Sequence, residues 1–356
     1  MKLYGWGVYW NEYRLELIIK GENMQFRNLG NTGLKVSEIG FGCGNVGGLM
    51  IRAPLVERLQ AIDRALELGI NYFDTAPAYG DGQSEENLGE VISFRKPKVV
   101  VATKFSFTQE DLDDTEGAIR RSLEASLRRL KRNSVDIFQL HTPVFAGNNR
   151  ASRGIELKYI LGPRGIADAL DKLRANGLFR FIGFTGLGDT PPLYELVRST
   201  RFDLLQVYYN LINPTAAILV SPGFTGQNFD GLMTEAVRHN MGVVAIRVLS
   251  GGALGGAVAR RGYAAPLVGG TLVSGGEYDL DLERASKLNF LLKGSVSSLS
   301  QAAIRFVLGQ PGVSTALVGF SNLEQIEEAA ACSDQGSLPE SNLTQLKKLW
   351  LSDFKL

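Results

Sequence analysis

Four polar residues follow apolar runs that have the length of β-strands. Asp74 and Tyr79 follow one run, Lys104 ends the next, and His141 ends the one after that. The carboxyl ends of parallel strands meet at one rim of a barrel, and active sites of such barrels lie at that rim. We therefore expect these four side chains to lie together in an active site.

The types of these residues predict a particular chemistry. Lys104, held by Asp74, would place a positive charge beside the phenol of Tyr79. An adjacent cation favours the phenolate form, which makes Tyr79 a usable general acid. His141 could donate a hydrogen bond to a substrate carbonyl oxygen and stabilise the charge that develops there. The set therefore indicates acid-assisted chemistry at a carbonyl group.

Each residue taken alone also has an ordinary structural interpretation. An aspartate at a strand end commonly serves a turn or a cap, and a tyrosine in Pro-Ala-Tyr-Gly can be a packed aromatic. A lysine that ends an apolar strand is less ordinary, because its ammonium must find a partner. The only other histidine, His239, lies near a helix end, where a cation suits the dipole, and we interpret it as structural. The joint placement on consecutive strands is what favours function.

Strand-length apolar runs alternate with helical periodicity along most of the chain. A hairpin is predicted at 26–36. Apolar residues recur with helical spacing in two segments, at Leu55, Leu59, Ile62, Leu66 and at Ile119, Leu123, Leu127, Leu130. Asp113 is expected to cap the second of these helices, and Gly69 and Gly177 are expected at helix ends. Eight such strand-helix units predict a closed (β/α)₈ TIM barrel. The predicted strands are Val36–Gly42, Asn71–Thr75, Val99–Lys104, Val135–His141, Arg180–Thr185, Leu204–Tyr209, Val243–Leu249 and Thr315–Gly319.

Two long connections, 142–165 and 251–293, follow strands and are expected on the catalytic face, either as loops over a ligand or as flexible links. The segment 341–354 is expected to form a helix outside the barrel.

The order and spacing of these motifs resemble the aldo-keto reductase family from about Phe26 onward. The resemblance is carried by Gly33-Leu34-Lys35-Val36-Ser37-Glu38-Ile39-Gly40-Phe41-Gly42 and by the three stretches that contain the four polar residues. It implies an α/β TIM barrel with an N-terminal hairpin and a C-terminal extra helix. It also implies an NAD(P)H-dependent oxidoreductase that interconverts an aldehyde or ketone with its alcohol, in which Asp74, Tyr79, Lys104 and His141 are catalytic and Tyr79 supplies the proton.

The resemblance also implies cofactor contacts. Gln206 matches the residue that bonds the carboxamide, Thr185-Gly186 stands where the family usually has Ser-Asn, and Ile246 replaces the usual stacking aromatic. Gly319 and Gln325 replace a Lys and an Arg, so NADP(H) is expected to be preferred and NAD(H) to be possible. The expected contacts are Gly42, Cys43, Asp74, Thr185, Gly186, Gln206, Ile246, Arg247, Leu249, Gly251, Gly319, Phe320, Ser321, Gln325 and Glu328.

Composition excludes several other classes. Lys and Arg number 38 against 37 Asp and Glu among 356 residues, so the basic excess that nucleic-acid binding requires is missing. Two histidines and two cysteines offer no metal-ligand cluster and no disulfide framework. With no signal peptide and no apolar run of about 18 residues, we expect a cytoplasmic protein with no membrane or nucleic-acid partner and a small-molecule carbonyl or alcohol substrate.

The domain boundary and the function each leave alternatives. We expect residues 24–356 to be a single barrel domain. Residues 1–23 are either an ordered extension or sequence upstream of a start at Met24, and we assign them no function. Two rival functions are a cofactor-binding, redox-sensing subunit with little turnover and a barrel aldolase that uses Lys104 as a Schiff base. The sequence predicts neither the substrate nor the oligomeric state.

Overall fold

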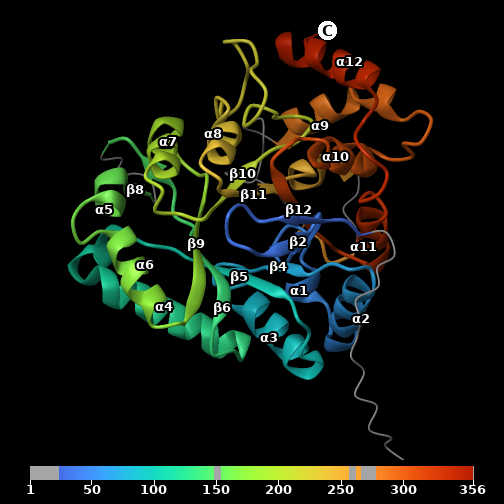
Figure 1. The fold of residues 1–356 in the computed structure, drawn as a ribbon. Coiled ribbons are helices and arrows are strands. Elements are labelled where there is room, and N and C mark those ends of the chain that lie inside the picture. Colours follow the sequence, from blue (N-terminus) through green and yellow to red (C-terminus); the bar gives the residue numbers. More distant parts are fainter. Residues whose placement is uncertain (1–23, 148–153, 256–261, 266–277, 356) are drawn as a thin grey trace, which may run out of the picture.

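The computed structural model describes residues 24–147, 154–255, 262–265 and 278–355. Eight parallel strands close into a barrel in which each strand pairs with the next along the chain and the last pairs with the first. This confirms the (β/α)₈ prediction, and Figure 1 shows helices surrounding the strands. The strands are β3 (Ile39–Gly42), β4 (Tyr72–Asp74), β5 (Val100–Phe105), β6 (Val135–Leu140), β9 (Phe179–Thr185), β10 (Leu204–Tyr208), β11 (Gly242–Ile246) and β12 (Val313–Gly319).

The predicted hairpin is present. Strand β1 (Phe26–Asn28) pairs antiparallel with β2 (Lys35–Ser37). Leu29 and Val36 are fully buried and pack with the side chains that fill the barrel interior. The prediction of one strand over 36–42 was wrong, because the chain passes from the hairpin to the barrel at Glu38, whose N–H donates to Gln25 and whose carbonyl accepts from Ala316.

The barrel interior alternates along each strand, as the two-residue period of a strand requires. Val100 and Ala102 of β5 and Ile137 of β6 belong to an inner cluster, whereas Val101 and Phe138 pack outward against the helices. Continuing the inward series to the carboxyl ends of the strands places Lys104, Gln139 and His141 in the uppermost layer of the barrel. The strand period thus aims these three side chains toward one mouth of the barrel.

Helices of the predicted kind cover the barrel. The predicted apolar positions of α2 and α4 are buried or partly buried, and Gly69 and Gly177 adopt left-handed backbone just after α2 and α6. The predicted cap Asp113 was wrong by one residue, since Asp114 accepts from the N–H of Gly117. The helices are α1 (Leu49–Arg52), α2 (Leu55–Glu67), α3 (Gln83–Arg95), α4 (Thr115–Leu130), α5 (Leu157–Leu161), α6 (Ile166–Ala175), α7 (Thr190–Arg198), α8 (Leu232–Arg238), α9 (Tyr278–Ser286), α10 (Leu299–Leu308), α11 (Leu323–Ala330) and α12 (Glu340–Leu351).

The two long connections contain elements of their own. The first holds strands β7 (Val144–Phe145) and β8 (Ile155–Glu156) and helix α5. The second begins with a 3₁₀ segment, η2 (Ser250–Gly255), and its residues 256–261 and 266–277 lie outside the described residues. The C-terminal helix α12 lies outside the barrel strands (Figure 1). It packs on α10, with the ring centroids of Phe306 and Trp350 5.6 Å apart. No described helix is long and apolar enough to cross a membrane.

A buried carboxylate connects α3 and α4 to the strand that carries Lys104. Glu85 on α3 is fully buried, accepts a hydrogen bond from Thr103 on β5 and forms an ion pair with Arg129 on α4. The two helices also approach closely at Gly89, where an added Cβ would lie 2.4 Å from the carbonyl oxygen of Arg129. The close approach of α3 and α4 is therefore part of what holds β5 in place.

We predict that Gly89→Ala destabilises the protein by about 1–3 kcal/mol, because the new methyl group overlaps the α4 backbone. Helix propensity alone predicts the opposite sign, a gain of up to about 1 kcal/mol. Urea denaturation would measure the difference. Ser93→Ala, at an exposed position of the same helix, serves as the control and should stay within about 0.5 kcal/mol of the parent. A Gly89→Ala protein as stable as the parent would contradict the packing argument.

Candidate active site

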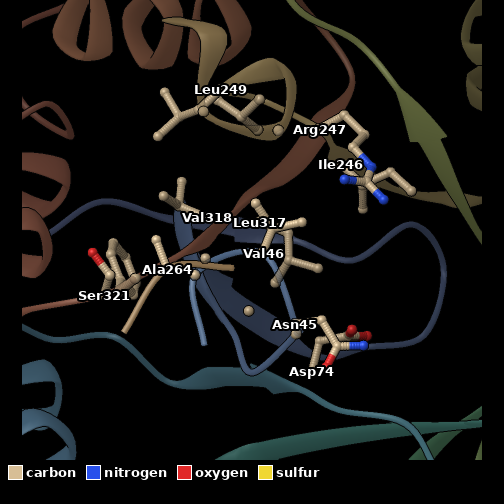
Figure 2. Close-up of a pocket in the computed structure, with 18 of the residues that line it drawn as sticks. Asn45, Val46, Asp74, Ile246, Arg247, Leu249, Ala264, Leu317, Val318 and Ser321 are labelled. Carbon is tan, nitrogen blue, oxygen red and sulfur yellow. The ribbon is translucent and has the colours of Figure 1, made fainter. Parts of the chain in front are cut away.

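A cavity of about 690 Å³ opens at the carboxyl ends of the barrel strands. Figure 2 shows that β11 and the segment after it contribute Ile246, Arg247 and Leu249, and that β12 contributes Leu317 and Val318. The volume lies within the usual range for small-molecule sites, about 300–1,000 Å³. Tyr79, His141 and Asp74 all line this cavity.

A buried ion pair joins two neighbouring strands beneath the cavity. The side chains of Asp74 and Lys104 are each 1% exposed, and Lys104 Nζ donates a short hydrogen bond to Asp74 Oδ1. Nζ also donates to the carbonyl of Thr75 at 2.9 Å and lies 3.2 Å from the hydroxyl of Tyr79. Burial is the largest influence on the pKa of Lys104 and lowers it, but the charge and hydrogen-bond interactions with Asp74 and Tyr79 together outweigh burial, so this pKa is raised above its ordinary value. The ammonium is therefore charged at neutral pH.

The second carboxylate oxygen of Asp74 is held by two amide side chains. Gln206 Nε2 donates to Asp74 Oδ2 at 2.6 Å and Gln139 Nε2 donates to the same atom at 3.2 Å. Both glutamines are buried. These hydrogen bonds fix the orientation of the carboxylate.

The loop after β4 presents Tyr79 to the cavity. The N–H of Gly80 donates to Asn45 Oδ1 at 3.0 Å, and the carbonyl of Tyr79 accepts from the N–H of Ser84. The Tyr79 ring meets His141 edge to face, with ring centroids 5.9 Å apart. Tyr79 therefore lies at the mouth with the Lys104 ammonium beside its hydroxyl and the His141 imidazole against its ring.

His141 is held as a neutral imidazole. Burial is the main cause, and the positive charges of Lys104 and Arg247 add to it, so the pKa of His141 falls to about 3. A neutral imidazole can donate one hydrogen bond to a carbonyl oxygen, but at neutral pH it carries no extra proton to transfer. Among the residues that line this mouth, His141 is therefore placed to orient a ligand by a hydrogen bond.

The structure places most of the expected cofactor contacts around the same cavity. Cys43 and Gly186 are buried and do not line it. The expected residues that do line it are Gly42, Asp74, Thr185, Gln206, Ile246, Arg247, Leu249, Gly251, Gly319, Phe320, Ser321, Gln325 and Glu328.

At the start of α11 the polar groups bond one another. Gln325 Oε1 accepts from the N–H of Ser321 at 2.8 Å and from its hydroxyl at 3.1 Å, while Asn322 caps the helix. The Ser321 amide is thus already used within the turn. Glu327 points away to Arg64, and Glu328 lines the cavity and accepts from the hydroxyl of Ser298.

Sequence reasoning missed two residues that the strand period could have found. Gln139 stands two positions before His141, and Tyr208 stands two positions after Gln206, so each shares the inward face of its strand with a residue already singled out. Gln139 holds Asp74, and Tyr208 lines the cavity. Asn45, which holds the Tyr79 loop, has no such signal, because it lies in a loop whose path depends on tertiary contacts.

The donor set suits a nicotinamide. Thr185 Oγ1 is buried without a hydrogen-bond partner among the described residues, and Thr185 lines the cavity. A buried hydroxyl left unpaired is costly, so a ligand that bonds it is favoured. Gln206 lies in the paired register position on β10 and also lines the cavity. Thr185 and Gln206 together offer the hydroxyl and amide groups that a carboxamide can bond.

Comparison with known proteins identifies the class. The profile of the aldo/keto reductase family matches residues 38–351, which is most of the chain. The chain therefore belongs to the aldo/keto reductase family. Aldo-keto reductases act on small-molecule carbonyl substrates, and the protein is an oxidoreductase.

Two relatives and one solved structure show how far the likeness extends. L-galactose dehydrogenase of Arabidopsis thaliana is 29% identical over 318 residues, which cover 86% of this chain and 88% of the relative. D-threo-aldose 1-dehydrogenase of a Pseudomonas species is 30% identical over 240 residues, covering 60% and 69%. An aldo/keto reductase of Klebsiella pneumoniae, solved in complex with NADP and acetate, has a TM-score of 0.65 at 23% identity and covers 90% of this chain and 94% of its own. This last likeness concerns the fold.

We predict that His141 remains neutral from about pH 8 down to about pH 5, since its pKa is about 3. The chain has only two histidines, so a His239→Gln variant leaves a single imidazole for proton NMR. Its ring signals should not shift across that range. A titration midpoint above about pH 5 would contradict the burial argument.

The depressed pKa also predicts the sign of an effect on stability. The folded-state pKa lies below the unfolded value of about 6.5. The stabilising contribution of neutral His141 to the free energy of unfolding is therefore fully present above about pH 6.5 and is lost as the pH falls toward 3.

Proposed function

We propose that this protein is an NADP(H)-dependent reductase that converts an aldehyde or ketone to its alcohol, or runs the reverse reaction, with Tyr79 as the proton donor. The observation that carries the proposal is the 3.2 Å contact between the buried, charged Lys104 and the Tyr79 hydroxyl at the rim of a cavity that suits a dinucleotide. The family membership supports the same reaction class.

The residues of the chain divide the reaction between them. Thr185 and Gln206 would hold the carboxamide of a nicotinamide, which would supply the hydride when bound. The neutral His141 donates a hydrogen bond to the substrate carbonyl oxygen and orients it. Tyr79 donates its proton to the same oxygen as negative charge develops there. Lys104 stabilises the phenolate that remains, and Asp74 keeps Lys104 charged and in place.

The aldolase alternative fits the site less well. A Schiff-base lysine must lose its proton to attack a carbonyl carbon. The pKa of Lys104 is raised by its buried neighbour Asp74 even though burial alone would lower it, and Nζ is fully engaged with Asp74, Thr75 and Tyr79. Lys104 therefore acts as a fixed charge in this proposal and not as a nucleophile.

Tyr79→Phe is expected to lower kcat for carbonyl reduction by at least ~10²-fold, the typical contribution of a general acid, and to leave the Kd for NADPH nearly unchanged. Steady-state kinetics on a panel of aldehydes, together with fluorescence titration of the cofactor, would measure both. Tyr194→Phe, which removes a hydroxyl that bonds Asp230 outside the cavity, is the matched control and should keep its activity. Retention of more than about a tenth of kcat in Tyr79→Phe would show that another group supplies the proton.

The cofactor preference is expected to be modest. Gln325 stands where many family members carry a cation, and a neutral amide cannot form a charge-assisted bond to a 2′-phosphate. Ser321 and Gln325 can still offer neutral donors, so we expect NADP(H) to bind about tenfold more tightly than NAD(H). Gln325→Arg should widen this ratio.

The Kd values of both cofactors, measured at one ionic strength, test this expectation. A preference for NAD(H), or a discrimination above about three orders of magnitude, equivalent to roughly 4 kcal/mol, would mean that other groups line the phosphate pocket.

A further inference from the structure

The backbone turns sharply at Arg247, directly after the last residue of β11. Arg247 has φ 57°, a left-handed conformation that side chains other than glycine rarely adopt. Its carbonyl oxygen accepts hydrogen bonds from Asn210 Nδ2 and from the N–H of Ser250, both at 2.8 Å. The surrounding structure thus fixes an unfavourable conformation, which is common where a functional side chain must be aimed.

This turn brings the Arg247 side chain to the cavity. The guanidinium carbon lies 5.6 Å from the centroid of the Tyr208 ring, on the neighbouring strand β10, and both residues line the cavity. Figure 2 shows Arg247 and Ile246 toward the same end of the cavity as Asp74, with Ser321 and Ala264 at the opposite end. The positive charge of Arg247 also contributes to the low pKa of His141, after burial and Lys104. Arg247 therefore belongs to the end of the cavity where the carbonyl chemistry would occur.

Arg247 has no acidic partner among the described residues. Two other charged side chains that line the cavity are Asp74, which is paired with Lys104, and Glu328, which is held by Ser298 near the start of α11. Contact with an aromatic ring offsets only a small part of the cost of removing a guanidinium from water. Among the described residues, the Tyr79 end of the cavity thus carries one positive charge without an acidic partner, that of Arg247, and a half-buried guanidinium there favours an anionic ligand.

We infer that the substrate of this enzyme carries an anionic oxygen group, a carboxylate or a phosphate, which Arg247 binds while the carbonyl group lies at Tyr79 and His141. The inference rests on the proposed reductase function and names the class of substrate for the same site. It distinguishes this protein from a reductase of neutral sugars or simple aldehydes, whose substrates offer no anionic group to Arg247. The guanidinium of Arg247 packs over the ring of Tyr208.

Matched pairs of substrates test the charge and vary its distance from the carbonyl. Succinic semialdehyde is compared with its amide, 4-carboxybenzaldehyde with 4-formylbenzamide, and glyceraldehyde 3-phosphate with glyceraldehyde. We expect kcat/KM for the anionic member of at least one pair to exceed that of the neutral member by about tenfold or more, a typical effect of a charge-assisted hydrogen bond. The pair that shows the preference distinguishes carboxylate from phosphate.

Variants at Arg247 then assign the preference to this residue. Arg247→Gln should reduce the ratio of anionic to neutral kcat/KM by about tenfold, mainly through KM, and Arg247→Lys should restore part of it. Arg121→Gln removes an exposed arginine on α4, whose side chain is 66% exposed, and controls for net charge. It should leave the ratio unchanged.

A binding measurement separates failure of this inference from failure of the proposed function. Calorimetry on the NADP-loaded protein should show that benzoate binds more tightly than benzamide, and that Arg247→Gln removes the difference. If neutral aldehydes are reduced but the ratio of anionic to neutral kcat/KM is near one for every pair, the inference about the substrate is wrong and the reductase function is supported. If benzoate binds through Arg247 but no aldehyde is reduced, the reductase function falls.

The pyrophosphate of the cofactor is the rival anion for Arg247. If Arg247→Gln weakens NADPH and NADH binding by tenfold or more while the substrate ratio is unchanged, the arginine serves the cofactor and the inference is overturned. We expect both cofactor Kd values to change by less than about threefold, well below the effect of losing a charge-assisted bond.

Discussion

The buried ion pair between Asp74 and Lys104 constrains the whole mouth of the barrel. Removing two charges from water costs several kcal/mol for each ion, and this is offset only when further hydrogen bonds satisfy both groups. Gln139 and Gln206 bond the carboxylate, and Thr75 and Tyr79 lie against the ammonium. These partners come from β6, β10 and the loop after β4, so the pair is stable only when several strands keep their register. The fold and the site therefore depend on the same contacts.

The pair also explains why the site can be both rigid and reactive. Every atom that holds Lys104 belongs to a buried strand or to a loop fixed at Asn45, so the ammonium cannot move away from the Tyr79 hydroxyl. A charge that is already in position does not have to reorganise when negative charge develops on the phenol. Gln206 contributes to this rigidity with its Nε2, which leaves its carbonyl end as the part that can meet a ligand. One amide side chain can thus serve the ion pair and the cavity together.

The sequence was sufficient for the parts of the site that follow from the strand period. Asp74, Lys104 and His141 end consecutive strands, and a parallel barrel leaves little freedom in where such residues point. Arg247 is different, because strand periodicity ends at Ile246. Its direction comes from a left-handed backbone whose carbonyl accepts hydrogen bonds from Asn210 and Ser250. Ser321 and Gln325 show the same limit: their residue types allowed a phosphate contact, whereas their mutual hydrogen bond depends on the local turn.

The charge of Arg247 matters to the mechanism even without an anionic ligand. Together with burial and Lys104 it keeps His141 neutral. In the proposed reaction the imidazole then orients the carbonyl group while Tyr79 transfers the proton. An anion bound to Arg247 would partly cancel this field and allow the pKa of His141 to rise. Because that pKa starts near 3 and burial is its largest cause, the imidazole would remain neutral at physiological pH. The same arginine can therefore select an acidic substrate without changing which residue donates the proton.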